Sequence, residues 1–237
     1  SMFSKETYVS RRAVLRSNVK GGLVVIFGNQ EAPCNYPNNT YPYRPDSTFL
    51  YYFGSVRENL VGVIDIDEGK EYLIGDDVDI EDIVWYGKIE NVADIAAKVG
   101  VANSAPMAKL KELCDAAVQA GRKVHFLPPY RGETKIQIMD LLGIHPSQQK
   151  AAASLELIMA VVHQRDKKTA EEIVEIEKAC HIGYLMHTTA MKMCSPNVSE
   201  REIAGVISGI AMSHGAQVSF LPIVTMHGEI MHGVTSS

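Results

Sequence analysis

Basic residues are few in this sequence and are never clustered. Lys and Arg together number 23, against 28 Asp and Glu, and the formal net charge is -5. A protein that binds nucleic acid through its phosphates needs a concentrated basic surface. The composition therefore predicts no nucleic-acid partner.

Long apolar runs are missing as well. No stretch approaches the roughly 20 apolar residues that a membrane-spanning helix needs. The first residues also lack the basic segment followed by an apolar one that is typical of a secretion signal. We expect a soluble, cytoplasmic protein with no membrane partner, in which Ser1, ahead of Met2, is a remnant of cloning.

Cysteine is scarce, and the cysteines do not occur in closely spaced pairs. Cys34, Cys114, Cys180 and Cys194 lie far apart in the sequence, and no CxxC pair occurs. This spacing argues against a zinc knuckle and against a redox motif. We expect reduced thiols that are mostly buried.

Several common catalytic and binding motifs are absent. The sequence has no Walker loop, no GxGxxG turn after a strand and no GxSxG elbow, which removes the simplest nucleotide-binding and serine-hydrolase readings. The acidic residues 76–82 lack the central glycine and closing glutamate of an EF-hand loop. A solvated loop or a helix start is the better interpretation of that stretch.

The first part of the chain has the pattern of a mixed α/β domain. The sequence has 237 residues, of which 46% are hydrophobic, enough for one large domain or two smaller ones. Apolar runs between glycines and turn residues predict strands, and apolar residues at three- and four-residue spacing predict helices. The predicted strands are 22–28, 49–53, 60–66, 71–74 and 123–127, and the predicted helices are 11–17, 92–99, 107–120 and 133–142.

The rest of the chain is predominantly helical. A helical stretch, 151–163, leads into the charged residues 165–168, which we interpret as a domain boundary. Capping-box patterns at Thr169 and at Ser199 each predict the start of a helix, the first ending near Cys194 and the second near Gly215. Residues 217–224 then have the pattern of a strand, and two helices with so little sheet suggest a domain that is incomplete at Ser237.

Four histidines near the end of the sequence are candidate metal ligands. His181 and His187 are six residues apart on one predicted helix, whereas helical ligand pairs are three or four apart, so we interpret both as structural. Residues 227–232 read HGEIMH, in which the glutamate is out of place for an HExxH zinc site. On a strand His227 and His232 would face opposite sides, although one of them could face a cleft.

Three passages resemble a known family. Residues 41–54, YPYRPDSTFLYYFG, resemble the signature of the N-terminal domain of bacterial Xaa-Pro aminopeptidases, and residues 58–63 and 84–87 are similar to its next strand and its tryptophan-glycine turn. Residues 165–173, RDKKTAEEI, resemble the opening of that family's catalytic domain. Residues 196–203, PNVSEREI, resemble the link between its first two helices, with Asn197 in place of the usual glycine.

A later passage of the sequence is the one that implies a site residue. Residues 220–224 followed by 230–232 are similar to the segment that leads to the family's substrate-side histidine. By that resemblance His232 hydrogen-bonds the substrate or the reaction intermediate, a role suited to imidazole. His227 is the weaker alternative, because the spacing from residues 223–224 is a little short.

The resemblance implies a fold and a domain organisation. The fold class is α/β: a mixed-sheet, creatinase/aminopeptidase P-type N-terminal domain at residues 2–150, a linker helix at 151–165, and an incomplete pita-bread α+β domain at 166–237. The aromatic loop, residues 41–52, would lie at a subunit contact or near the substrate entrance of a neighbouring subunit, or simply pack on the sheet.

The resemblance also implies an activity for a parent protein. That protein releases the N-terminal residue from peptides with proline in second position, using two divalent metal ions, manganese or alternatively zinc or cobalt, and forms a homodimer or higher homo-oligomer. The family's metal ligands lie beyond the histidine element, so no metal ligand is assigned here and the 237-residue chain is expected to be inactive alone. The alternatives are a prolidase, a creatinase-like hydrolase, or a noncatalytic binding or oligomerisation module.

Overall fold

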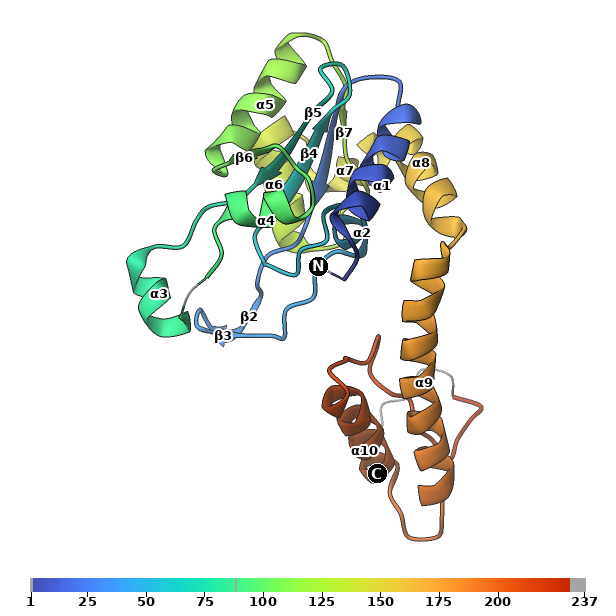
Figure 1. Cartoon of the computed structure of the whole chain (residues 1–237). Coiled ribbons are helices and arrows are strands. Elements are labelled where there is room, and N and C mark those ends of the chain that lie inside the picture. Colours follow the sequence, from blue (N-terminus) through green and yellow to red (C-terminus); the bar gives the residue numbers. More distant parts are fainter. Residues whose placement is uncertain (1, 88, 231–237) are drawn as a thin grey trace. The chain divides into compact units, whose positions relative to one another are not determined.

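The structure is a computed structural model, and it describes residues 2–87 and 89–230 (Figure 1). The chain divides into two compact units, Ser1–Lys167 and Lys168–Ser237. The first unit holds a mixed α/β fold, and the second contains two packed helices followed by an extended segment.

A five-stranded sheet with the order β6-β5-β4-β1-β7 forms the centre of the first unit. β4 runs antiparallel to both β1 and β5, whereas β7 is parallel to β1 and β6 is parallel to β5. The sheet is therefore mixed, which confirms the predicted fold class. The strands are β1 (Leu23–Phe27), β4 (Val61–Asp65), β5 (Lys70–Ile74), β6 (Asn103–Ala105) and β7 (Val124–His125).

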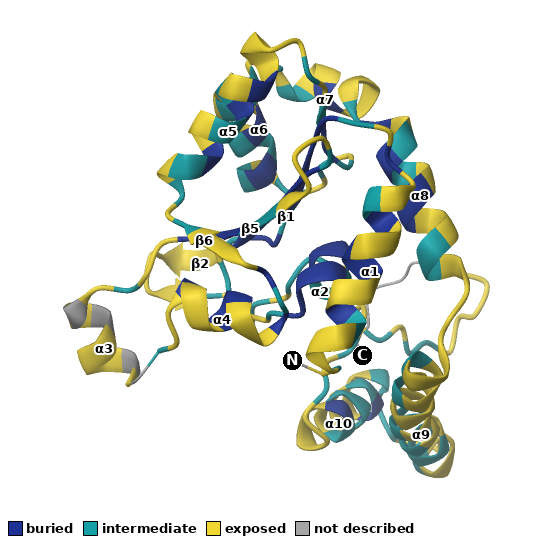
Figure 2. Ribbon diagram, turned by 45° about the horizontal axis from the view of Figure 1, so that its top comes forward, coloured by how far each residue is buried: buried dark blue, intermediate teal, exposed yellow. Residues whose placement is uncertain are grey.

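Helices cover both faces of this sheet (Figure 2). Successive β1 residues point to opposite faces: Val24 and Ile26 join one buried cluster, and Leu23 and Val25 join another. The first cluster includes residues of α1 (Lys5–Ser17), α2 (Ser47–Phe53), α4 (Val92–Lys98) and α8 (Leu155–Asp166); the second includes residues of α5 (Ala108–Gln119) and α6 (Gly132–Leu142). This burial on both sides explains why β1 is apolar throughout.

The prediction of a strand at residues 49–53 was wrong, because α2 occupies this segment. The Asp46 side chain accepts a hydrogen bond from the Phe49 amide at 2.9 Å and so caps the helix start. Gly54 ends the helix with φ of 62°, a left-handed value that glycine adopts without strain. Phe49, Tyr52 and Phe53 are all buried at helical spacing, so tertiary burial overrides the strand preference of aromatic residues.

The other elements of the first unit are short. The segment between β1 and α2 contains a small hairpin of β2 (Pro33–Tyr36) and β3 (Asn39–Thr40), and the acidic stretch after residue 75 leads into α3 (Ile80–Tyr86). β6 and α7 (Pro146–Ala152) were not predicted as separate elements. β6 has only three residues, too few for a sequence period to show.

Both predicted capping boxes exist in the second unit. Thr169 opens α9 (Ala170–Met193) with Glu172 as its reciprocal partner, and Ser199 opens α10 (Glu200–Ser213) with Glu202. Asn197, between the helices, has φ of 71°. Asparagine tolerates this left-handed conformation better than most residues, so it can stand where the family usually has glycine.

The second unit buries little of its apolar surface. Among its described residues only Ile203 and Ala211 are buried, and α9 buries none of its side chains. The strand predicted at residues 217–224 is absent from the described structure, since no neighbouring strand is there to pair with it. The expectation of mostly buried thiols was wrong. Cys180 and Cys194 are exposed in this unit, which buries few side chains, and Cys34 is exposed in the β2 hairpin. Cys114 is buried.

The predicted linker, residues 151–165, covers the end of α7 and most of α8. Leu157, Ala160 and Val161 of α8 belong to the buried cluster of the first unit, and the division between the units falls after Lys167. The family identity of the second unit, as the start of a pita-bread domain, stays a prediction.

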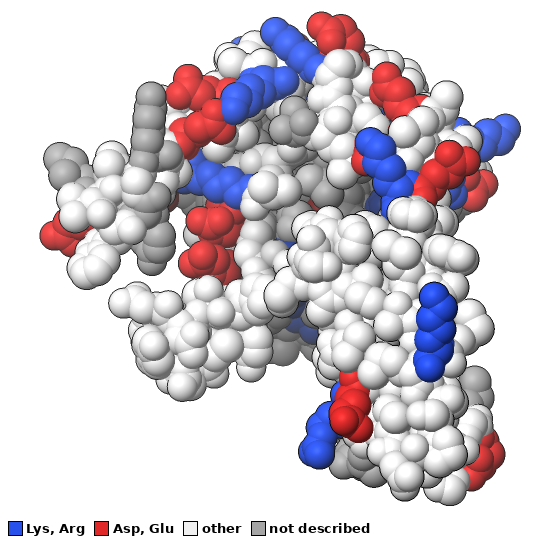
Figure 3. Space-filling model, turned by 60° about the horizontal axis from the view of Figure 1, so that its bottom comes forward, with Lys and Arg blue, Asp and Glu red and all other residues white. Residues whose placement is uncertain are grey.

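Two surface properties bear on function. No helix in the described ranges is long and apolar enough to cross a membrane. Basic and acidic side chains are interspersed on the face shown in Figure 3. The scattered charges of the sequence therefore stay scattered on this face of the molecule.

Candidate functional site

The strongest site candidate in the first unit lies at one edge of the sheet. β1, β5, β6 and β7 run in the same direction, so their carboxyl ends meet at this edge, together with the beginning of antiparallel β4. Ligands of open α/β sheets bind in crevices outside the carboxyl ends of the strands. The residues that follow β1 and β7 are therefore the first to consider.

The loop 41–46, which carries part of the family resemblance, is anchored over the end of β1. The Tyr43 hydroxyl donates to the Gly28 carbonyl at 2.8 Å, and the Asp46 amide donates to the same carbonyl at 3.1 Å. Asn29, buried and left-handed with φ of 84°, donates through its side chain to the Arg44 carbonyl at 3.3 Å. These bonds fix the loop to the sheet edge.

Tyr130, from the segment after β7, joins the same network. Its hydroxyl donates to Asp46 Oδ1 at 2.7 Å and accepts from Asn29 Nδ2 at 3.2 Å. Burial raises the pKa of Tyr130 and of Tyr43, so both hydroxyls stay neutral and remain donors at physiological pH. The network thus joins the ends of β1 and β7 to the start of α2.

Charged groups lie nearby. Arg131 donates to the Gln30 carbonyl at 2.8 Å and pairs with Glu133 at 3.0 Å. Partial burial, followed by the negative charge of Glu58, raises the pKa of Glu31. This edge can recognise a ligand through hydrogen bonds, and we assign no nucleophile to it. Neither Tyr130 nor Arg131 is predicted from the sequence, and their place in the segment after β7 is the one signal that points to them.

The second candidate region is the segment that contains the predicted histidines. His227 is 68% exposed; its amide donates to Thr225 Oγ1 at 2.9 Å, and its ring lies 3.3 Å from Glu229. The Met226 amide donates to Glu200 at 2.6 Å, which ties the segment to the start of α10. His232 lies outside the described residues, so the structure does not test the assignment of either histidine.

The described residues do not fit a metal centre. No group of three or more His, Cys, Asp or Glu within them could hold an ion. His181 and His187 are both exposed on α9, and the His181 ring stacks on Tyr184 with the ring centroids 6.3 Å apart. No step through a metal is therefore derived for the part of the chain that the structure describes.

Comparisons with known proteins agree with this architecture. Residues 8–125 match the family model of the aminopeptidase P N-terminal domain. The Xaa-Pro aminopeptidase of Escherichia coli is 24% identical over 97% of this chain and 54% of its own length, and a probable Xaa-Pro aminopeptidase of Talaromyces stipitatus is 22% identical over 93% and 42%. The chain thus spans about half the length of these relatives.

Solved structures show the same fold. The low-pH form of E. coli aminopeptidase P superposes with a TM-score of 0.71 at 24% identity, covering 91% of this chain and 51% of that one. Proline aminopeptidase P II from Yersinia pestis gives 0.70 at 22% identity, covering 90% and 51%. A zinc-substituted E. coli aminopeptidase P in complex with product gives 0.70 at 23% identity, covering 91% and 51%. Residues 8–125 thus match the aminopeptidase P N-terminal domain family, and the chain shares the fold of its solved members.

Proposed function

We propose that this chain is the amino-terminal part of a metal-dependent Xaa-Pro aminopeptidase, which releases the N-terminal residue from peptides whose second residue is proline. The observation that carries the proposal is the extent of the similarity: curated Xaa-Pro aminopeptidases align with 93% to 97% of the chain, including its second unit. The fold of the first unit agrees with it.

The metal requirement belongs to this proposal. In the relatives a zinc-substituted form exists with product bound, and the resemblance implies two ions, manganese, zinc or cobalt, held by residues beyond the histidine element. When bound, such ions lower the pKa of a water molecule and polarise the scissile carbonyl. Because the described residues do not fit the ions, we propose that the 237-residue chain alone is inactive.

His232 is the residue of this chain to which we assign a direct role. An imidazole N–H that donates to the substrate carbonyl or to the intermediate would stabilise the charge that develops there. His227 is the alternative; its side chain is exposed and beside Glu229. A homo-oligomeric, cytoplasmic parent enzyme completes the proposal.

The test compares this chain with one extended through the following coding sequence. Both are assayed with manganese, for bound metal and for cleavage of a peptide with proline in second position, with an alanine peptide as control. We expect about two metals and proline-dependent cleavage only in the extended form. Cleavage by the 237-residue chain would disprove its inactivity, and two inert, metal-free proteins would favour the noncatalytic module.

The histidine assignment needs variants of the extended form. His232→Ala should lower kcat by about 10²- to 10⁴-fold if the ring acts in the reaction. His227→Ala should have little effect, and His181→Ala, an exposed histidine on α9, is the matched control. A large loss for His227→Ala with none for His232→Ala would reverse the assignment.

A further inference from the structure

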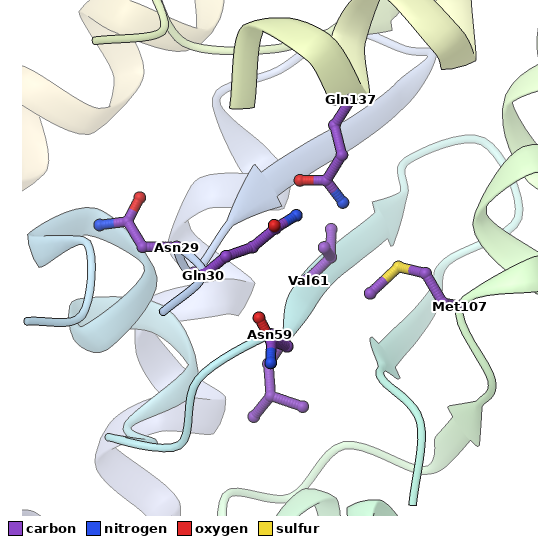
Figure 4. Close-up of a pocket in the computed structure, with 8 residues that line it drawn as sticks. Asn29, Gln30, Asn59, Val61, Met107 and Gln137 are labelled. Carbon is purple, nitrogen blue, oxygen red and sulfur yellow. The ribbon is translucent and has the colours of Figure 1, made fainter. Parts of the chain in front are cut away.

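A small pocket opens at the carboxyl edge of the sheet, beside the anchored loop (Figure 4). Gln30 follows β1, Asn59 precedes β4, Met107 precedes α5, and Gln137 belongs to α6. The side chains of Gln30, Gln137 and Met107 converge on the space, whereas the Asn29 side chain points away from it. Four separate segments of the chain therefore form this site.

Three of the lining side chains are carboxamides with unused hydrogen-bonding capacity. Within the described chain, the side chains of Gln30, Asn59 and Gln137 make no hydrogen bond. Asn29 differs, since its amide is bonded to Arg44 and Tyr130. Each free carboxamide offers two N–H donors and an acceptor oxygen, which matches a peptide group, itself one donor and one acceptor.

The main chain around the pocket is already fixed. The Gly28 amide donates to the Leu60 carbonyl, and the Asn59 amide donates to the Asn29 carbonyl, both at 2.9 Å. Gly28 also packs so closely that a Cβ there would lie 2.7 Å from the Leu60 oxygen. A ligand would therefore need to order only side chains on binding, which lowers the entropic cost.

The size of the pocket and the charge of its lining restrict the kind of ligand that it can bind. The cavity is about 10 Å³, near the lower limit for one water molecule, so it admits a single group such as a carbonyl oxygen. Among the described residues no charged side chain lines it, and the apolar side chains of Leu60, Val61 and Met107 border it. These features favour a neutral amide over a carboxylate or an amine.

We infer that this pocket receives the carbonyl oxygen of one main-chain amide group of a peptide, with the carboxamides of Gln30, Asn59 and Gln137 around it as hydrogen-bond partners. The inference goes beyond the proposed peptidase reaction, because it concerns recognition by the first unit alone. It does not depend on metal or on the second unit.

The test titrates the ¹⁵N-labelled 237-residue chain with N-acetyl-triglycine amide, a capped peptide that has no charge, no free amino terminus and no proline. It cannot serve as an Xaa-Pro substrate, so the result is independent of the peptidase assay. We expect saturable shifts of the Gln30, Asn59 and Gln137 side-chain NH₂ signals, with a Kd on the order of 1–10 mM.

Variants assign the shifts to the pocket. Gln30→Ala and Gln137→Ala should each raise Kd about threefold to tenfold, the effect of one lost hydrogen bond, while Gln119→Ala, an exposed carboxamide of α5, should leave it unchanged. Gln30→Asn serves if Gln30→Ala fails to fold. If these NH₂ signals show no saturable shift up to about 100 mM peptide, the pocket is a water site only and the inference is overturned. Binding of sodium acetate with the same Kd as the peptide would also overturn it.

Discussion

Replacing Arg12 with methionine should strongly destabilise the first unit. The Arg12 side chain is fully buried, and its guanidinium donates to Glu71 at 2.8 Å, to the Tyr52 carbonyl at 2.8 Å and to the Val99 carbonyl at 2.6 Å. It thereby joins α1 to β5, to α2 and to the end of α4. Methionine retains the apolar stem but none of these donors.

The expected loss of stability follows from the buried groups that lose their partner. The two carbonyls lose a charged donor, and Glu71, whose side chain is 12% exposed, loses its buried partner while retaining a bond to Arg16. Breaking a buried ion pair on one side costs about 3–5 kcal/mol. Arg16→Met is the matched control: Arg16 binds the same carboxylate but is 33% exposed, so we expect about 0.2–1 kcal/mol.

Urea denaturation followed by circular dichroism would measure both variants, with hydrogen exchange of the β1 and β4 amides reporting on the first unit. The double variant Arg12→Met with Glu71→Met should be less unstable than the sum of its single changes, since the carboxylate no longer lacks its partner. Equal effects of Arg12→Met and Arg16→Met would refute the reasoning.

Three further outcomes are expected. Asp46→Ala should cost about 1–2 kcal/mol in urea denaturation, since it removes the α2 cap and the Tyr130 acceptor; a loss no larger than that of Tyr130→Phe would contradict the capping role. Burial raises the pKa of Cys114 to about 11, so iodoacetamide at neutral pH should alkylate Cys34, Cys180 and Cys194 first, as mass spectrometry would show; early reaction at Cys114 would argue against its burial. The Arg122 hydrogen bond, then the Gly22 amide, lower the pKa of Asp67. The stabilisation by the Asp67 carboxylate is present above the unfolded pKa of about 3.9 and is lost as pH falls through the lower folded value. Asp67→Asn should therefore flatten the decline of the unfolding free energy in acid. An unchanged decline would argue against a stabilising Asp67–Arg122 pair.

The sequence predicted the elements whose signals are local and repeated. The apolar β1 run between glycines and the two capping boxes were identified correctly because short-range chemistry determines them. The segment 49–53 failed because its aromatic residues favour strands, while burial at helical spacing against the sheet decided otherwise. Residues 217–224 failed because a strand needs a partner that the described second unit does not provide.

The candidate site was less predictable, because residues far apart in sequence form it. Tyr130 reaches Asp46, and Gln30 lies beside Gln137, only after the fold has brought the ends of β1 and β7 and the middle of α6 together. Tyr130, Gln30 and Gln137 belong to no motif, and only Asp46 lies in the family passage, residues 41–54. Their common property, a position just beyond the carboxyl edge, becomes visible only when strand direction is known.

The residues that carried the family resemblance prove to hold the fold together. Tyr43 anchors the loop to β1, and Asp46 caps α2. Gly54 ends that helix and lies so close to the Tyr8 ring that a Cβ added there would be 2.5 Å from a ring atom. Each is required by a geometric constraint that other residue types meet poorly. The motif therefore identifies an architecture, and the chemistry attributed to it comes from the relatives. For that reason the experiment that can connect this fold to a reaction uses the extended chain, in which metal binding and the effect of His232→Ala on cleavage can be measured together.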